Sequence, residues 1–126
     1  MRKINKLIVH CSATREGQDV TVETIRKWHV EGRGWSDIGY HFYIDIHGKI
    51  HKGRDIAKMG AHCKGYNRNS IGICYAGGVE QDGKTPADTR TFEQEEALLC
   101  VLRTLKAMYP DATIHSHRDF ANKACP

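Results

Sequence analysis

The stretch Ile4-Asn5-Lys6-Leu7-Ile8-Val9-His10-Cys11-Ser12 contains a short apolar run in which three residues are β-branched. A run of this kind is typical of a buried strand, and it predicts one over residues 4–9. The strand leads directly into His10 and Cys11, and the alternation of side chains along a strand sends these two residues to opposite faces of the sheet. The chain therefore carries a histidine to the end of a buried strand.

The segments after this strand alternate between apolar runs and helical patterns. Thr21 is a suitable N-cap, and Gly32 a suitable end, for a helix over residues 22–31 with Trp28 and His29 on its apolar side. Further strands are expected at residues 39–46, 49–52, 71–75 and 113–115, the first two joined as a hairpin by the turn at His47-Gly48. Residues 53–70 lack periodicity and predict a long structured loop.

The plainest helix signal is the capping box Thr91-Phe92-Glu93-Gln94. An apolar stripe at helical spacing follows it, formed by Leu98, Val101, Leu102, Leu105 and Met108. Strands interleaved with two helices predict an α/β fold. We expect a single domain over residues 1–126, with a central mixed β-sheet flanked by helices.

Composition limits the function classes. The chain has 126 residues and a net charge of +4, which is mild and only weakly favours an anionic partner. It has no apolar run long enough to span a membrane and no secretory signal, so a cytoplasmic protein is expected. Five cysteines without a paired spacing argue against a disulfide framework. Cys74 and Cys100 lie in apolar stretches and are expected to be buried.

The stretch His115-Ser116-His117-Arg118-Asp119-Phe120-Ala121-Asn122-Lys123-Ala124-Cys125 gathers two histidines, a lysine and a cysteine. Imidazole nitrogen and thiolate sulfur are the ligands that zinc prefers. His115 and His117 share the same parity along a strand, so alternation does not separate them, and only the spacing to Cys125 favours His117. A catalytic zinc site then needs a third ligand from elsewhere in the chain.

Four segments supply a resemblance to a known family. They are Val9-His10-Cys11-Ser12-Ala13-Thr14, Gly39-Tyr40-His41-Phe42, the loop Gly60-Ala61-His62-Cys63-Lys64-Gly65-Tyr66-Asn67-Arg68-Asn69-Ser70-Ile71-Gly72-Ile73, and His117-Arg118-Asp119 followed by Lys123-Ala124-Cys125-Pro126. In this order and spacing they resemble the type 2 N-acetylmuramoyl-L-alanine amidases, which include short phage lysozymes and the animal peptidoglycan recognition proteins. The resemblance runs from about Ile4 to Pro126 and is strongest to the phage branch.

The resemblance implies that His10, His117 and Cys125 bind zinc at one edge of the sheet, in a substrate groove. It implies that Tyr40 and Lys123 flank the metal as catalytic residues. Another branch of the family has a carboxylate at the position of Tyr40, so no glutamate base is expected here. The residues implied to lie in the loop lining the groove are His62, Asn67 and Asn69.

The chemistry agrees with this ligand set. Three protein ligands leave a fourth zinc position for water, whose pKa falls to about 7. A cation aimed at the oxyanion of amide hydrolysis contributes roughly 3–4 kcal/mol, and Lys123 is the candidate. Tyr40 either orients the water or donates to the oxyanion, unless it only packs in the core. Zinc-bound water, relayed through Tyr40 or solvent, is the expected proton source for the leaving amine.

The leading hypothesis is zinc-dependent hydrolysis of the amide between N-acetylmuramic acid and L-alanine in peptidoglycan. A non-catalytic peptidoglycan-binding module is the main alternative, followed by a cysteine hydrolase using Cys125 or Cys11. A zinc-stabilised nucleic-acid binder ranks last, because paired cysteines and a basic stripe are absent. The expected partner is peptidoglycan or a muropeptide, with no nucleic acid or membrane, and a monomer is expected. Release through a phage-type lysis system and action in wall recycling are both open. Relatives usually continue beyond the position of Pro126, so a shortened form and an absent segment are open as well.

The remaining histidines have simpler expected roles. His29, His47 and His51 are assigned to the surface or to helix packing, and His41 to a structural role beside the site. Cys11 is expected to be a packed thiol that points away from His10.

Overall fold

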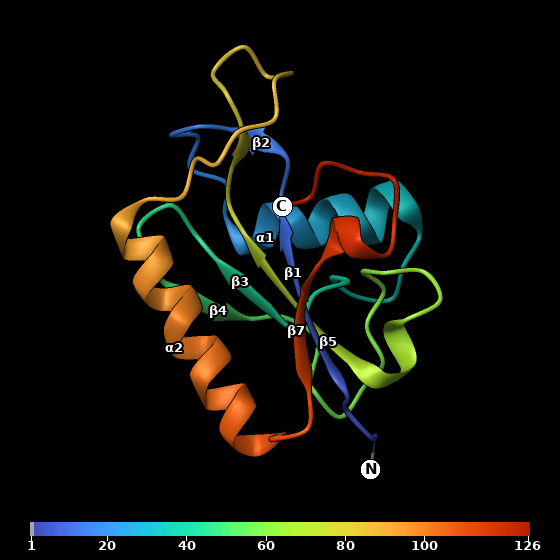
Figure 1. Ribbon diagram of the computed structural model, residues 1–126. Coiled ribbons are helices and arrows are strands. Elements are labelled where there is room, and N and C mark those ends of the chain that lie inside the picture. Colours follow the sequence, from blue (N-terminus) through green and yellow to red (C-terminus); the bar gives the residue numbers. More distant parts are fainter. Residues whose placement is uncertain (1) are drawn as a thin grey trace.

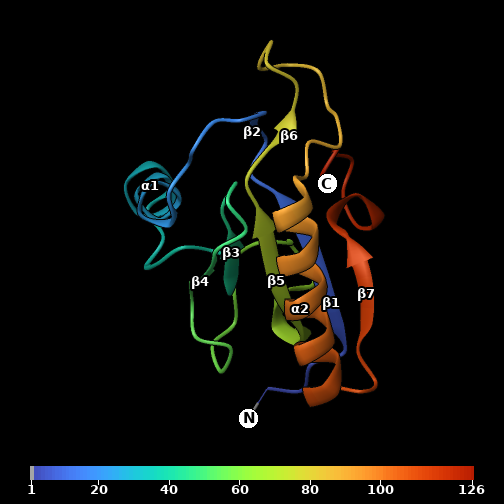
Figure 2. The same ribbon diagram turned by 90° about the vertical axis from the view of Figure 1, so that its left-hand side faces the viewer.

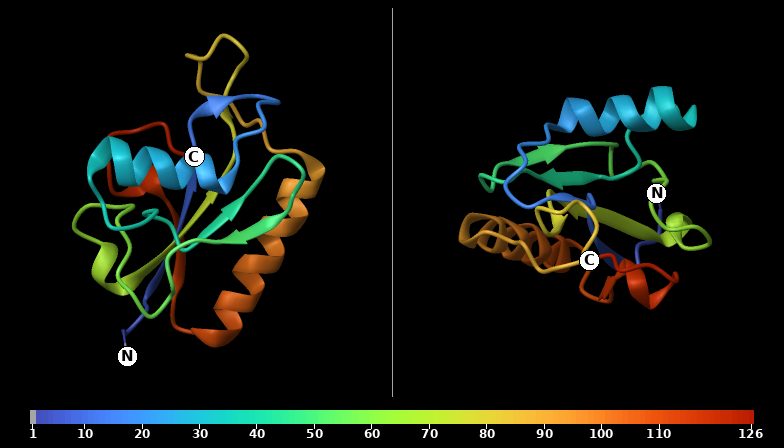
Figure 3. Two further views of the ribbon diagram at one scale, coloured as in Figure 1. Left: turned by 180° about the vertical axis from the view of Figure 1, so that it is seen from behind. Right: turned by 90° about the horizontal axis from the view of Figure 1, so that it is seen from above.

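The computed structural model describes residues 2–126 as a mixed sheet with α1 (Val22–Lys27) on one face and α2 (Phe92–Met108) on the other (Figures 1 and 3). The main sheet contains β1 (Lys6–Cys11), β3 (Phe42–Ile44), β4 (Ile50–Lys52), β5 (Ser70–Tyr75) and β7 (Thr113–Ser116). A small second sheet pairs β2 (Thr14–Arg15) with β6 (Gly78–Val79). The α/β prediction is confirmed.

The five main strands follow the order β4-β3-β5-β1-β7 (Figure 2). Four of them are parallel, and only β4 runs antiparallel, in the predicted hairpin with β3. Every residue of the central strand β5 is buried, as a strand covered by helices on both faces requires. The sheet is therefore mixed, and β1 lies between the centre and the edge strand β7.

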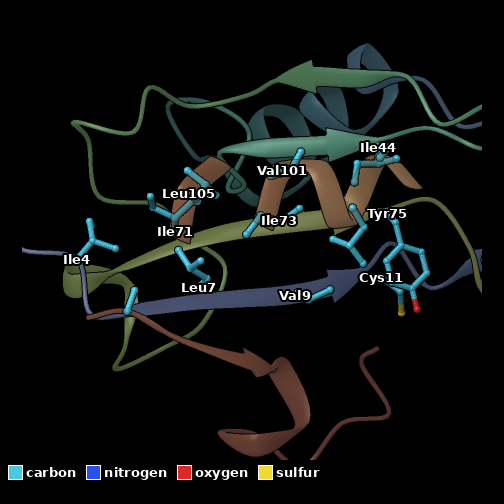
Figure 4. Packing of buried hydrophobic residues seen from close by; sticks show 13 residues of the cluster. Ile4, Leu7, Val9, Cys11, Ile44, Ile71, Ile73, Tyr75, Val101 and Leu105 are labelled. Atoms are coloured by element: carbon cyan, nitrogen blue, oxygen red, sulfur yellow. The ribbon is translucent and has the colours of Figure 1, made fainter. Parts of the chain in front are cut away.

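The core has two parts, one on each face of the sheet. Figure 4 shows the part beneath α2, where Leu7, Val9 and Cys11 of β1 pack with Val101 and Leu105. Because side chains alternate along a strand, His10 points to the opposite face, the side covered by α1. The residues of the core on that side are Val20, Val22, Ile25, Ile38, Tyr43, Cys74 and Ala76.

The predicted capping box is present at the start of α2. The Thr91 side chain accepts a hydrogen bond from the Gln94 N–H at 3.0 Å, and the Gln94 side chain accepts one from the Thr91 N–H at 3.0 Å. Buried Gln94 also donates to the Ala76 carbonyl at 2.8 Å, which fixes α2 to the end of β5. Two details of the predicted helix were wrong: Met108 is 52% exposed, and Cys100 is exposed on the outer face of the helix.

Two expected elements differ from the sequence pattern. The strand expected over residues 39–46 is shorter, because the backbone before it bonds to the chain at Gly53 and Arg54. Its alternation therefore fails outside β3, and Tyr40 packs on the α1 side instead of with Phe42. The first helix continues from Lys27 as a π-helical turn, Trp28–Gly32. Trp28, expected on the apolar side of the helix, is the first residue of this turn and is 45% exposed.

Within residues 2–126, no helix is long and apolar enough to cross a membrane.

Candidate metal centre

His10 is the first side chain of the centre and lies at the carboxyl end of β1. It pairs in register with Cys74 of β5, and only 1% of its surface is exposed. In open α/β sheets, ligands bind beyond the carboxyl ends of the parallel strands, so this position is the expected one for a site.

His117 reaches the same place from the neighbouring strand. It follows β7 and begins a 3₁₀ turn, His117–Asp119. Asp119 accepts a hydrogen bond from the Ser116 N–H at 3.1 Å and fixes the turn. His117 is consequently buried with its Nδ1 atom 3.1 Å from the Nδ1 atom of His10.

Cys125 completes the group from the loop that follows this turn. The Arg118 N–H donates to the Cys125 carbonyl at 2.7 Å and closes the loop. The Cys125 Sγ atom accepts a hydrogen bond from the Cys11 N–H at 3.2 Å and lies 3.8 Å from His10 Nδ1. Cys11 itself is buried in the core on the α2 side, as expected.

These three side chains fit a zinc ion. Their donor atoms all lie within 4.8 Å of one another. A tetrahedral zinc with ordinary bond lengths separates two nitrogen ligands by about 3.3 Å, and a nitrogen from a sulfur by about 3.6 Å. The separations of 3.1 and 3.8 Å measured from His10 Nδ1 are close to those values.

The electrostatics keep both imidazoles neutral. Burial lowers the pKa of His10 well below 6.5, and the neighbouring His62 and His117 lower it further. Burial also lowers the pKa of His117, with a contribution from the Lys123 ammonium. The thiol pair behaves differently: a side-chain hydrogen bond from Cys125 lowers the pKa of Cys11 to about 7. Neutral imidazoles keep the lone pairs that a metal needs.

Tyr40 lies beside His10, with their ring centroids 5.1 Å apart. It precedes β3 and packs on the α1 side of the sheet. Burial raises the pKa of Tyr40 well above 10, so its hydroxyl keeps its proton at neutral pH. Tyr40 can therefore act as a hydrogen-bond donor at the site.

A groove of about 740 Å³ lies beside this centre and meets it at His117. His117, Tyr40 and the exposed Lys123 line it, together with Lys64 and Arg33. Among residues 2–126, no Asp or Glu lines the groove, and its charged lining residues there are all cationic. A smaller hollow of about 370 Å³ lies near Arg90, Arg118 and Pro126, and none of the described residues that line it is a histidine or cysteine.

The three residues assigned to the groove loop occupy different positions. Asn67 lines the groove, but its side-chain oxygen accepts hydrogen bonds from the N–H groups of His62 and Cys63, both at 2.9 Å. Asn69 does not line the groove, and its amide donates to the Lys3 carbonyl at 2.8 Å. His62 lines the groove yet is 8% exposed, and its Nδ1 atom lies 2.8 Å from His10 Nε2.

His115, His41 and His51 have hydrogen-bond partners outside the group of three. His115 lies outside the group of three, and its Nε2 atom bonds to the Thr113 hydroxyl at 2.6 Å. Buried His41 donates to the Lys58 carbonyl through Nε2 at 2.8 Å, because its Nδ1 accepts the Gly72 N–H. His51 binds Asp45, as a surface histidine can.

His29 was assigned to the surface or to helix packing, yet it lines the groove. It accepts the Gly39 N–H at 2.9 Å, and its ring lies 5.5 Å from that of Tyr40. Trp35 and Phe120 also line the groove and were not identified from the sequence. The sequence gives no periodic signal for them, because both lie in irregular segments.

Comparison with known proteins identifies the family of this chain. Residues 1–126 match the family described as N-acetylmuramoyl-L-alanine amidase. The endolysins of Enterobacteria phage T3 and Escherichia phage T7 are each 48% identical over 120 residues, which cover 95% of this chain and 78% of each relative.

Solved structures give the same result. The N-acetylmuramoyl-L-alanine amidase LysC from Clostridium intestinale superposes with a TM-score of 0.84 at 29% identity, over 99% of this chain and 77% of that one. The bumblebee protein PGRP-SA gives a TM-score of 0.84 at 25% identity, over 100% of this chain and 77% of that one. The chain therefore belongs to the N-acetylmuramoyl-L-alanine amidase family and is an amidase of this class.

Proposed function

We propose that this amidase depends on zinc held by His10, His117 and Cys125, and that it cleaves the amide between N-acetylmuramic acid and L-alanine in peptidoglycan. The observation that carries the proposal is the convergence of two neutral imidazoles and one thiol beside a groove. Zinc in a site with three protein ligands supplies a Lewis acid and activates water near neutral pH.

Lys123 is proposed to stabilise the negative charge that develops on the amide oxygen. It lies two residues before Cys125, and its ammonium acts on the pKa of both His10 and His117. Because it lines the groove, the ammonium can reach a bound substrate. A preorganised charge of this kind acts in the transition state more than in the ground state.

Tyr40 is proposed to donate a hydrogen bond from its neutral hydroxyl at the reacting amide. The ring is held between His10 and His29, so the side chain is positioned before substrate binds. The same hydroxyl can relay a proton to the leaving amine.

The cationic groove suits the acidic stem peptide of a muropeptide. Lys64 and Arg33 line it, and ammonium and guanidinium groups bind carboxylates through charge-assisted hydrogen bonds. Asn67 is proposed to contribute to substrate binding mainly by shaping the loop, and Asn69 by anchoring that loop to Lys3. Because relatives of this chain at 48% identity are phage endolysins, we propose that the substrate is the wall polymer of a bacterial host.

The test uses purified chain and a defined muropeptide. We expect release of a new α-amine on L-alanine, loss of that release after complete removal of zinc by a chelator, and recovery when zinc is returned. Activity that survives complete zinc removal would overturn the metal dependence. Muropeptide binding without any release, by a chain that carries one zinc, would instead favour the non-catalytic binding module.

A further inference from the structure

The two ring nitrogens of His10 have different surroundings. Nδ1 faces the donor atoms of His117 and Cys125, whereas Nε2 points away from them and lies 2.8 Å from Nδ1 of His62. An imidazole binds a metal only through a nitrogen that carries no proton. If Nδ1 binds the metal, the ring proton is on Nε2, and it is donated to His62.

His62 then has a fixed protonation pattern of its own. Its Nδ1 accepts the proton from His10, so a neutral His62 ring carries its proton on Nε2. That nitrogen lies 3.2 Å from the hydroxyl of Ser70, which is fully buried. The hydrogen bonds therefore run in one direction, from His10 to His62 to Ser70, and both nitrogens of His62 are used within the protein.

Two glycine residues leave space for the His62 ring against the sheet. A Cβ atom added to Gly72, in the central strand, would lie 2.5 Å from the Cγ atom of His62. A Cβ added to Gly60 would lie 2.8 Å from the Cδ2 atom of the same ring. Glycine weakens a strand interior and often marks a close approach. Here it allows the His62 ring to lie directly against the strand.

We infer that His62, supported by Ser70, is a positioning residue that fixes the orientation and tautomer of His10 for metal binding. This inference rests on the proposed zinc ligation by His10. Metal-binding histidines usually donate their second N–H to a carboxylate, a carbonyl or water, and loss of such a partner typically weakens metal affinity about 10–100-fold. In this chain an imidazole buried against Gly72 takes the place of that acceptor.

A matched pair of substitutions tests the role of His62. His62→Asn keeps an acceptor, because the side-chain oxygen of asparagine lies near the position of the imidazole Nδ1. His62→Leu has nearly the same shape as His62→Asn and has no acceptor. We expect His62→Leu to weaken the zinc Kd about 10–100-fold in a chelator competition, and His62→Asn to recover most of that loss.

The hydrogen bond itself can be observed in the zinc-loaded parent chain labelled with ¹⁵N. We expect the proton of His10 on Nε2 and a scalar coupling across the hydrogen bond to His62 Nδ1. Ser70→Ala is a smaller change that removes the acceptor for His62. It should weaken the zinc Kd less than His62→Leu, and it provides the comparison if the leucine variant does not fold.

Different results would contradict the proposed zinc dependence and the role of His62. A folded parent chain that binds no zinc would overturn the proposed function and this inference with it. A parent chain that binds one zinc, while His62→Leu or Ser70→Ala leaves the Kd unchanged, would overturn the inference alone. A spectrum that places the proton on Nδ1 of His62, with zinc bound, would also overturn it.

Discussion

The backbone N–H of Cys11 donates to the Sγ atom of Cys125 at 3.2 Å, which ties the loop over residues 120–126 to the end of β1. This bond places the sulfur 3.8 Å from His10 Nδ1. The side-chain hydrogen bond to Cys11 and burial raise the pKa of Cys125, so metal binding would release the proton of its thiol. The chain thus orients the proposed third ligand before any metal is present.

Cys125→Ser is expected to lose zinc and activity together, because a hydroxyl is a much poorer zinc ligand than a thiolate. Zinc content and amide hydrolysis should be measured on the same preparation. The exposed Cys100→Ser provides a matched control that should keep both. Stoichiometric zinc of parental affinity in the Cys125 variant would show that the ligand set is wrong.

Tyr40→Phe should keep zinc and lower kcat by about 10²-fold, the usual cost of losing one oxyanion donor. The phenyl ring can retain the packing on His10 and His29, so the change removes only the hydroxyl. Steady-state rates on a muropeptide, with zinc content measured in parallel, test this. An unchanged kcat would reduce Tyr40 to a packing role.

Gln94→Ala is expected to destabilise the fold by about 2–3 kcal/mol, since it removes one half of the capping box and a bond to a carbonyl. The lost bond is the one to Ala76, at the end of β5. Glu96→Ala, exposed in the same helix, is the control and should change stability by less than about 0.5 kcal/mol. Urea unfolding of both variants measures the two changes in stability. Equal midpoints for Gln94→Ala and Glu96→Ala would contradict the stabilising role of Gln94.

Local sequence signals predicted the elements whose structure depends on neighbouring residues. The capping box at Thr91 and the apolar run of β5 are examples. Each is defined by residues within a few positions of one another in the sequence. Alternation failed at Tyr40, where the backbone is bonded to Gly53 and Arg54 instead of continuing a regular strand. Cys100 was misassigned because an apolar neighbourhood does not state which side of a helix faces water.

Predicting the candidate site required more than local sequence patterns. Ligand-type residues could be recognised near Cys125, but selecting His10 as their partner required the family resemblance, since 107 positions separate His10 from His117. The hydrogen bond between His10 and His62 could not be predicted, because it depends on the space left by Gly72 in another strand. Contacts of this kind depend on packing between strands that are far apart in the sequence. No local sequence pattern indicates them.

Asp45 is expected to make stability depend on pH in the acid range. Its carboxylate accepts hydrogen bonds from His51 and from the backbone of the hairpin turn. Burial acts to raise the pKa of Asp45, but these hydrogen bonds outweigh it and leave the pKa below its ordinary value. The carboxylate therefore contributes stability above the unfolded pKa of about 3.9, and this contribution is lost as the pH falls through the folded pKa.

Comparison with Asp45→Asn isolates this contribution. The difference in unfolding free energy between the two chains should shrink as the pH falls below about 4, because the pKa of the unfolded carboxyl lies near 3.9. Urea unfolding across this range measures it. A difference that grows as the pH falls would mean that the folded pKa is raised instead.

Lys123→Met should keep zinc and lose rate, because methionine is unbranched and apolar like the lysine stem but carries no charge. The ammonium is proposed to act on the developing oxyanion, so kcat should fall about 10²–10³-fold with little change in KM. Lys84→Met, at an exposed turn outside the groove, is the matched control and should keep parental kinetics. Unchanged turnover would remove Lys123 from the mechanism, whereas loss of zinc would show that it supports the Cys125 loop instead.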